Sequence, residues 1–289
     1  METRVSSSTK EVVISFKGAT VLIGDRINPT GRKKLTAALQ SGNMELVRQD
    51  AQAQVNAGAD ILDVNAGASG VDEEKVLPAL VRAVMDAVDV PLSLDSKNLA
   101  ALEAALAVYK GKAIVNSISG EERSFAEVLP LVKKYKAAVI GLTCDEKGIP
   151  PTAEQRLEIA RKIVERAMAA GIPKEDVIID CLTMTVATDT KAALVTLDAI
   201  RLVREKLGVN QTLGASNISH GLPDRDVLNS TFLALAIEAG VSCPYVHVEK
   251  VRPYILATDL LLGRDRYALR YIRAFRQRQT ISQNSNLKS

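Results

Sequence analysis

Tryptophan is absent from this chain of 289 residues, and histidine and cysteine are scarce, with two and three copies. Cys144, Cys181 and Cys243 lie far apart and form no C-x-x-C pair. A zinc cluster needs closely spaced Cys and His ligands, and a disulfide framework needs paired cysteines, so the sequence argues against both. We therefore expect no bound metal in this chain.

Long hydrophobic runs and an excess of one charge are also missing. No stretch approaches the roughly 18 uninterrupted apolar residues of a membrane helix, and the N-terminus METRVSSSTK lacks the apolar segment of an export signal. The 37 basic and 34 acidic residues are mixed along the chain, and only GRDRYALRYIRAFRQRQ near the C-terminus is locally basic. We expect a cytoplasmic protein with no membrane contact and no nucleic-acid partner.

What the sequence does contain is an alternation of short apolar runs with longer amphipathic stretches. The runs are rich in Val, Ile and Leu, and each is predicted to form a parallel strand buried on both faces. Eight are present, at residues 20–25, 60–65, 90–95, 112–117, 137–143, 176–180, 211–217 and 243–249. Eight βα units predict an α/β protein of the (β/α)8 TIM-barrel class, which needs about 250 residues and so takes up nearly the whole chain.

The remaining residues divide into two short ends. Residues 1–19 form an N-terminal extension, in which EVVISFKG at 11–18 has the pattern of a small β-hairpin under the barrel, whereas residues 1–9 look polar and loose. The barrel domain spans 20–276, and the polar residues 277–289 are predicted to be a flexible tail.

Every predicted strand ends in polar residues, and in a barrel these ends meet on one face, where active sites are built. They are Asp25, Asp63 with Asn65, Asp95, Asn116, Thr143, Asp180, Asn217, and His247 with Glu249. Any single one has about even odds of being only the cap of the following helix, so the set carries more weight than its members.

Acids and amides around one cavity suit a neutral, polar, planar ligand. A carboxylate pairs with two adjacent N–H donors of a ring through parallel hydrogen bonds, as it does with a guanidinium. A pterin has such an edge, and a purine or another amidine-like ring satisfies the same pattern. The strand ends alone do not distinguish a pterin from a purine or another amidine-like ring.

Six motifs that occur in one order narrow the choice. They are GDRINPTGRKK at 24–34, DILDVNAG at 60–67, LSLDSKN at 92–98, IVNSISGEE at 114–122, IIDCL at 178–182 and GASNIS at 214–219. Together they resemble the pterin-binding methyltransferases, namely the methyltetrahydrofolate:corrinoid methyltransferases and the folate domain of cobalamin-dependent methionine synthase. The resemblance covers about residues 20–265 and implies a TIM barrel like that of dihydropteroate synthase.

The resemblance implies a role for each matching position. Asp95 would hold the amino-oxo edge of the pterin, and Asn116 and Asp180 match further pterin-binding positions. Asn217 matches the family's mobile asparagine, which hydrogen-bonds N5 of the folate during methyl transfer. Further substrate-binding positions are Gly214, Ser216, Asn65, Asp63 and Arg26, although Asp63 fits loop organisation slightly better than ligand contact. The first strand departs from the family, because Asp25 stands where relatives commonly have Glu.

The implied substrates are tetrahydrofolate and 5-methyltetrahydrofolate, with the corrinoid supplied by a separate corrinoid protein that docks over the barrel mouth. The resemblance also implies a homodimer, and it leaves the direction of methyl transfer open.

Two other functions remain as alternatives. Dihydropteroate synthase would need Lys and Arg at the seventh strand, where this chain has GASNISHG. A non-catalytic folate-binding protein would keep the pocket and lose turnover, yet Asp95, Asn116, Asp180 and Asn217 are all present. His220 and His247 fit exposed or strand-end positions better than catalysis, and Cys181 reads as a small packed side chain.

Overall fold

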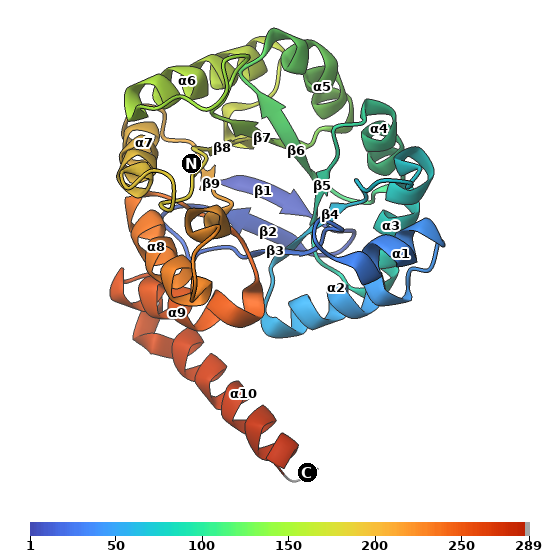
Figure 1. The fold of residues 1–289 in the computed structure, drawn as a ribbon, viewed down its shortest axis with the longest axis vertical. Helices are drawn as coiled ribbons and strands as arrows, with labels where there is room; N and C mark the ends of the chain where they lie inside the picture. The colour runs from blue at the N-terminus through green and yellow to red at the C-terminus, as the bar shows by residue number, and fades with distance from the viewer. Residues whose placement is uncertain (287–289) are drawn as a thin grey trace.

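The computed structural model describes the backbone of residues 1–286 and the side chains of residues 1–279. Eight parallel strands form the barrel, in the spatial order β10-β3-β4-β5-β6-β7-β8-β9 (Figure 1). A bridge between Gly214 and Tyr245 joins the two edges. The strands are β3 (Ile23–Ile27), β4 (Ile61–Asn65), β5 (Leu92–Asp95), β6 (Ile114–Ser119), β7 (Ala138–Leu142), β8 (Val177–Asp180), β9 (Gln211–Thr212) and β10 (Tyr245–Val246). All eight predicted strands are present, and the predicted barrel is confirmed.

Helices form the outer ring (Figure 1). They are α1 (Lys33–Gln40), α2 (Glu45–Ala57), α3 (Glu73–Ala87), α4 (Leu99–Val108), α5 (Glu122–Tyr135), α6 (Ala153–Ala169), α7 (Ala192–Lys206), α8 (Arg225–Ala239) and α9 (Val248–Leu261). In α6, for example, Leu157, Ala160, Val164 and Ala167 recur at three- and four-residue spacing and are buried against the barrel. Thr152 caps this helix by accepting a hydrogen bond from the Gln155 N–H.

The last two predicted strands are shorter than expected. β9 ends at Thr212, and residues 215–219 form the 3-10 turn η2 (Ala215–Ser219), because Ala215 and Ile218 are buried at the three-residue spacing of such a turn. The prediction that Glu249 ends the eighth strand is wrong, since α9 begins at Val248 and Glu249 lies in its first turn. Two further 3-10 turns are η1 (Lys174–Asp176) and η3 (Arg266–Ala268).

A β-hairpin closes the N-terminal end of the barrel. It pairs β1 (Thr3–Ser6) with β2 (Glu11–Ile14), so it starts earlier than the predicted 11–18, and residues 3–6 are not loose. The alternation of exposed and buried residues explains this, because Val5 and Ile14 turn inward and are fully buried. They pack with barrel residues that include Ile23, Ile61, Ile114, Ile140 and Ile178. This end of the interior is therefore apolar, and the polar strand ends lie at the other.

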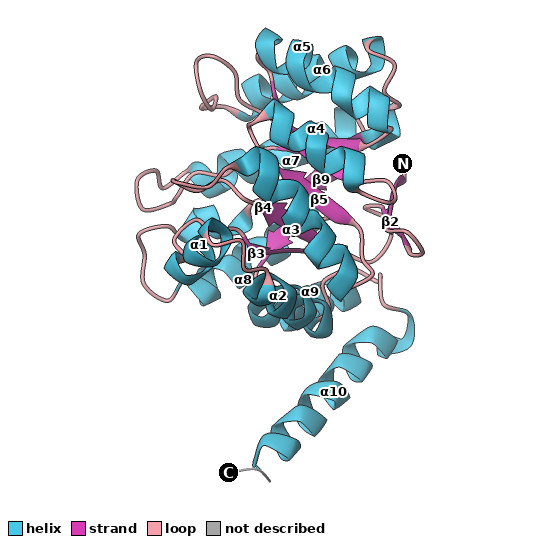
Figure 2. Ribbon diagram, turned by 90° about the vertical axis from the view of Figure 1, so that its right-hand side faces the viewer, coloured by secondary structure: helices cyan, strands magenta, loops and turns pink. Residues whose placement is uncertain are grey.

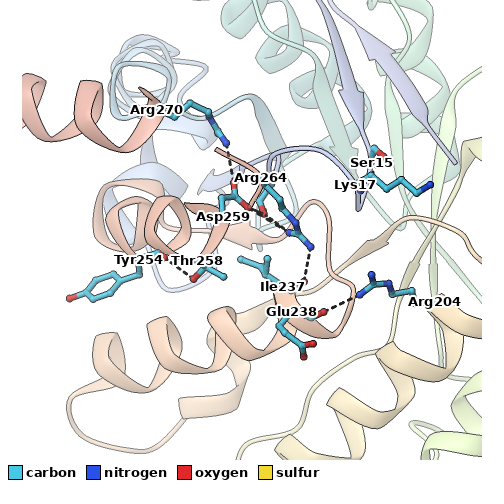
Figure 3. A network of polar contacts seen from close by, with 11 residues as sticks. Ser15, Lys17, Arg204, Ile237, Glu238, Tyr254, Thr258, Asp259, Arg264 and Arg270 are labelled. Atoms are coloured by element: carbon cyan, nitrogen blue, oxygen red, sulfur yellow. Dashed lines mark hydrogen bonds and ion pairs between the residues drawn. The ribbon is translucent and has the colours of Figure 1, made fainter. Parts of the chain in front are cut away.

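The chain leaves the barrel through α10 (Leu269–Asn286), which extends away from the other helices (Figure 2). Residues 277–286 of the predicted tail continue this helix, and 287–289 lie outside the described residues. Asp259 of α9 anchors its start (Figure 3). This fully buried carboxylate accepts hydrogen bonds from the N–H and hydroxyl of Thr20, at 2.9 and 2.7 Å, and forms ion pairs with Arg264 and Arg270.

Candidate active site

The polar strand ends gather at the end of the barrel opposite the hairpin, where the long loops lie (Figure 2). Strand register places three of them in one layer. Asn65 is aligned with Asp95, and Asp95 with Asn116, across β4, β5 and β6. Asp63 is aligned with Ser93, one level deeper in the barrel. The structure thus brings together four of the residues that the sequence predicts for the site.

The deeper level is a closed hydrogen-bonded cluster. The Ser93 hydroxyl donates to Asp63 Oδ1 at 2.8 Å, and the Tyr245 hydroxyl lies 2.6 Å from Ser93 Oγ. Asn116 Nδ2 also donates to Asp63 Oδ1, at 3.3 Å. Asp63 is only 3% exposed, and burial, aided by the nearby charge of Asp95, raises its pKa well above the usual range. These contacts make Asp63 a support for Ser93 and Asn116.

Asp95 is the carboxylate of the outer level, where it is aligned with Asn65 and Asn116. Asn65 Nδ2 donates to Asp95 Oδ2 at 2.8 Å, while Asn65 Oδ1 accepts the Gly67 N–H at 2.7 Å. The second bond fixes the orientation of the Asn65 amide, so its NH2 group faces Asp95. Burial raises the pKa of Asp95, and the Asn65 bond opposes that rise. Asp95 Oδ1 receives no hydrogen bond from another described residue and can accept one from a ligand.

Asp180 stands on the other side of the barrel, at the end of β8. Its Oδ1 accepts the N–H of Leu182 at 2.7 Å, and burial raises the pKa of Asp180 to about 6. The N–H groups of Leu182 and Gly214 oppose that rise. Gly214 is the residue before η2, so Asp180 helps to place the turn that follows β9.

Asn217 lies in that turn with its side chain exposed. No side-chain hydrogen bond of Asn217 occurs among the described residues, whereas the turn itself is held from α8. Arg225 donates to the Ser216 carbonyl at 2.7 Å and to Ser219 Oγ at 3.0 Å. The backbone on both sides of Asn217 is therefore fixed, while its side-chain amide has no partner in the described part of the chain.

A cavity of about 600 Å³ opens beside Asn217. Asp25 and Arg26 at the end of β3, Tyr245 of β10 and His247 line it together with residues of η2 and α8. Burial raises the pKa of Asp25 and lowers that of His247. Three of the predicted site residues, Arg26, Ser216 and Asn217, line this cavity. Asp95, Asn116 and Asp180 are not part of its lining.

Two residues of this region were missed from the sequence. Ser93 and Tyr245 lie two positions before Asp95 and His247, and side chains at i and i+2 of a strand point to the same face. This periodicity was available from the sequence and would have placed both hydroxyls inside the barrel. Of the residues expected to have no catalytic part, Cys181 is fully buried and His220 is exposed.

Among the described residues, no three His, Cys, Asp or Glu side chains are grouped to hold a metal ion. In the same part of the chain, none of the helices has both the length and the apolar character needed to cross a membrane.

Residues 24–247 match the protein family described as pterin binding enzyme. The methylcorrinoid:tetrahydrofolate methyltransferase of Eubacterium limosum is 32% identical over 265 residues, which cover 89% of this chain and 96% of that protein. The methionine synthase of Mycobacterium leprae is 34% identical over 268 residues, which cover 87% of this chain but only 22% of that much longer protein.

Solved structures with the same fold include dihydropteroate synthases. The enzyme of Yersinia pestis superposes with a TM-score of 0.68 at 16% identity, covering 91% of this chain and all of that one. The enzyme of Xanthomonas albilineans, solved with 7,8-dihydropteroate, gives a TM-score of 0.62 at 19% identity, over 90% of this chain and 98% of that one. At such identities the likeness establishes the fold alone.

Proposed function

The chain belongs to the pterin-binding enzymes, in the branch of the folate methyltransferases, and we propose that it moves a methyl group between N5 of tetrahydrofolate and the cobalt of a corrinoid carried by a separate protein. The observation that carries the proposal is the Asn217 amide, which has no hydrogen-bond partner among the described residues and stands at the barrel mouth on a fixed turn. The full-length relation to a methylcorrinoid:tetrahydrofolate methyltransferase supports the same reaction.

In this proposal the carboxylates of Asp95 and Asp180 and the amide of Asn116 hold the pterin ring. The open oxygen of Asp95 accepts one N–H group of the amino-oxo edge. Its other oxygen already accepts one bond from Asn65 and keeps a lone pair for the adjacent N–H group. Asn116 is held by Asp63, so its amide is oriented before the ligand arrives. The support under these residues is rigid, which keeps the ring in one position while the methyl group is exchanged.

Asn217 acts on the reacting nitrogen. When the N5–methyl bond breaks, its electron pair stays on N5, and N5 is a poor leaving group unless that developing charge is stabilised. The Asn217 N–H donates a hydrogen bond to N5, and the proton that N5 finally takes up comes from water. Cobalt(I) of the corrinoid supplies the nucleophile, so this chain has to position the folate and stabilise the leaving nitrogen.

We propose that the corrinoid protein docks over the barrel mouth and that the enzyme works in the cytoplasm as a homodimer. The three cysteines are free thiols, in keeping with a reducing compartment. Leu261, Leu269 and Phe275 around α9 and α10 are exposed and offer apolar surface to a second copy.

The experiment that tests the proposal follows a labelled methyl group. The protein is mixed with 5-[¹⁴C]methyltetrahydrofolate and cob(I)alamin, and separately with [¹⁴C]methylcobalamin and tetrahydrofolate, and the products are separated and counted. Protein-dependent transfer of label in either direction supports methyl transfer. Tight folate binding without transfer, with free cobalamin and with cognate corrinoid protein, would favour a binding protein. Formation of dihydropteroate and pyrophosphate from a dihydropterin pyrophosphate and p-aminobenzoate would favour a synthase.

A further inference from the structure

The cavity beside Asn217 contains more positive charge than the pterin ring requires. Its lining includes four cationic side chains, Arg26, Arg32, Arg225 and Lys250, and two carboxylates, Asp25 and Asp226. A pterin ring is neutral, so these cations call for a separate explanation.

Two of the four cations are matched by carboxylates. Arg32 forms hydrogen bonds of 2.7 and 3.2 Å with Asp50, and Lys250 forms bonds of 2.8 and 3.2 Å with Asp226. Arg32 also donates to the main-chain carbonyl of Arg26, which fixes the backbone there. These two pairs shape the wall of the cavity and leave little net charge of their own.

The other two cations form no hydrogen bond or ion pair with a carboxylate among the described residues. The Arg225 guanidinium donates only to uncharged oxygens, those of Ser216 and Ser219. The Arg26 side chain makes no hydrogen bond or ion pair with any described residue, although its main-chain N–H bonds Gln54. Asp25 is the neighbour of Arg26 in the wall; burial raises the pKa of Asp25, and the charges of His247 and Arg26 oppose that rise. The N-terminus of α8 begins at Arg225 and adds partial positive charge.

The rest of the lining is suited to an aromatic group. Leu233, Val246 and Val251 are at most 5% exposed and form an apolar part of the cavity wall beside Tyr245. The cavity therefore combines an apolar part with two arginines that form no ion pair within the described part of the chain.

We propose that this cavity is the subsite for the p-aminobenzoyl-glutamate tail of the folate, with Arg26 and Arg225 binding the glutamate carboxylates. The assignment rests on the proposed function. In a tetrahydrofolate the tail is attached at C6, next to N5, so a ring whose N5 faces Asn217 directs its tail into the space beside that residue. The aryl ring lies against the apolar wall, and the carboxylates reach the two arginines. The site accordingly prefers folates with several glutamates.

The variant that tests the proposal is Arg26→Gln, because the Arg26 side chain makes no hydrogen bond or ion pair with a described residue that the change would break. Its matched control is Arg82→Gln, which removes the same charge from the exposed surface of α3. Binding of three ligands is measured by calorimetry at low and at raised salt: 5-methyltetrahydropteroate, which lacks glutamate, and the mono- and triglutamate forms of 5-methyltetrahydrofolate.

The wild type and Arg82→Gln should bind the triglutamate about five to ten times more tightly than the pteroate, and the gain should shrink with salt. Arg26→Gln should lose most of that gain and keep its affinity for the pteroate. Equal affinity of the wild type for all three ligands, or an undiminished gain in Arg26→Gln, would overturn the tail subsite and leave the proposed function standing.

Two further outcomes are also decisive. If Arg26→Gln keeps the glutamate gain and instead weakens transfer to a corrinoid protein, the arginine serves the partner and the tail subsite is rejected. If no folate binds the wild type at all, the proposed function fails together with this inference.

Discussion

Replacement of Asn217 by alanine should separate folate binding from methyl transfer. The side chain is exposed, and no hydrogen bond of its amide occurs among the described residues, so its removal costs the folded state little. The turn around it is held by Arg225 through Ser216 and Ser219, and these bonds remain in the variant. The free energy of unfolding should stay within about 0.5 kcal/mol of the wild type.

The size of the kinetic effect follows from when the bond forms. A neutral hydrogen bond to the bound folate contributes about 0.5–1.5 kcal/mol, which limits the loss of affinity to roughly tenfold. A preorganised donor that faces charge developing in the transition state is worth about 2.7–4 kcal/mol, or roughly 10²–10³ in rate. The rate constant for transfer should therefore fall at least about tenfold further than the affinity does.

Stopped-flow absorbance of cob(I)alamin under saturating 5-methyltetrahydrofolate gives the rate constant, and calorimetry gives the affinity. Asn28→Ala is the matched control, because Asn28 lines the same cavity and its amide is already used by the Thr30 N–H at 3.0 Å. It should change the rate less than about threefold. Equal losses of affinity and rate in Asn217→Ala, or no loss of either, would refute a transition-state role for this amide.

Three further predictions concern single carboxylates. Asp95→Asn should weaken binding of 5-methyltetrahydrofolate by about 10- to 100-fold in calorimetry, because an N–H then faces the ring N–H; an unchanged dissociation constant would remove Asp95 from the pocket. Folate affinity should fall up to about tenfold per pH unit below the pKa of Asp180, near 6, because only the ionised carboxylate accepts the ring N–H groups. Asp180→Asn should flatten this dependence of folate affinity on pH. An unchanged dependence in the variant would contradict the role of Asp180. Asp259→Ala should lower the free energy of unfolding by about 3–5 kcal/mol in denaturant titration, because Arg264 stays largely buried without its partner. A loss under about 1 kcal/mol would show that the Arg264–Asp259 ion pair contributes little to stability.

The barrel was predictable from the sequence because parallel strands buried on both faces consist of apolar runs. Here these runs of Val, Ile and Leu recur along the chain. The ends of the chain were harder to predict. Thr3 and Val5 are buried only because the hairpin closes the barrel, and a short alternating segment does not reveal which surface will cover it. The end of β9 was misplaced for a related reason, since the buried Leu213 and Ala215 continue the apolar pattern beyond Thr212, although Ala215 already belongs to the turn η2.

Within the candidate site, the strand ends indicated which residues share a face but not how they contact one another. That Asn65 orients Asp95, and that Asp63 supports Asn116 from below, depends on strand register, which the sequence does not give. Arg225 lies in a helix after β9, and its hold on the turn of Asn217 depends on the path of the loop. Ser93 and Tyr245, by contrast, were within reach of the two-residue periodicity of strands.

The most direct test of the proposed reaction is the cobalt(I) absorbance band of free cob(I)alamin mixed with 5-methyltetrahydrofolate and the wild-type protein, together with the reverse mixture of methylcobalamin and tetrahydrofolate. The proposal predicts a protein-dependent loss of the band in the first mixture and its appearance in the second. A band that stays constant in both, with free cobalamin and with a cognate corrinoid protein while folate is bound, would contradict methyl transfer by this enzyme.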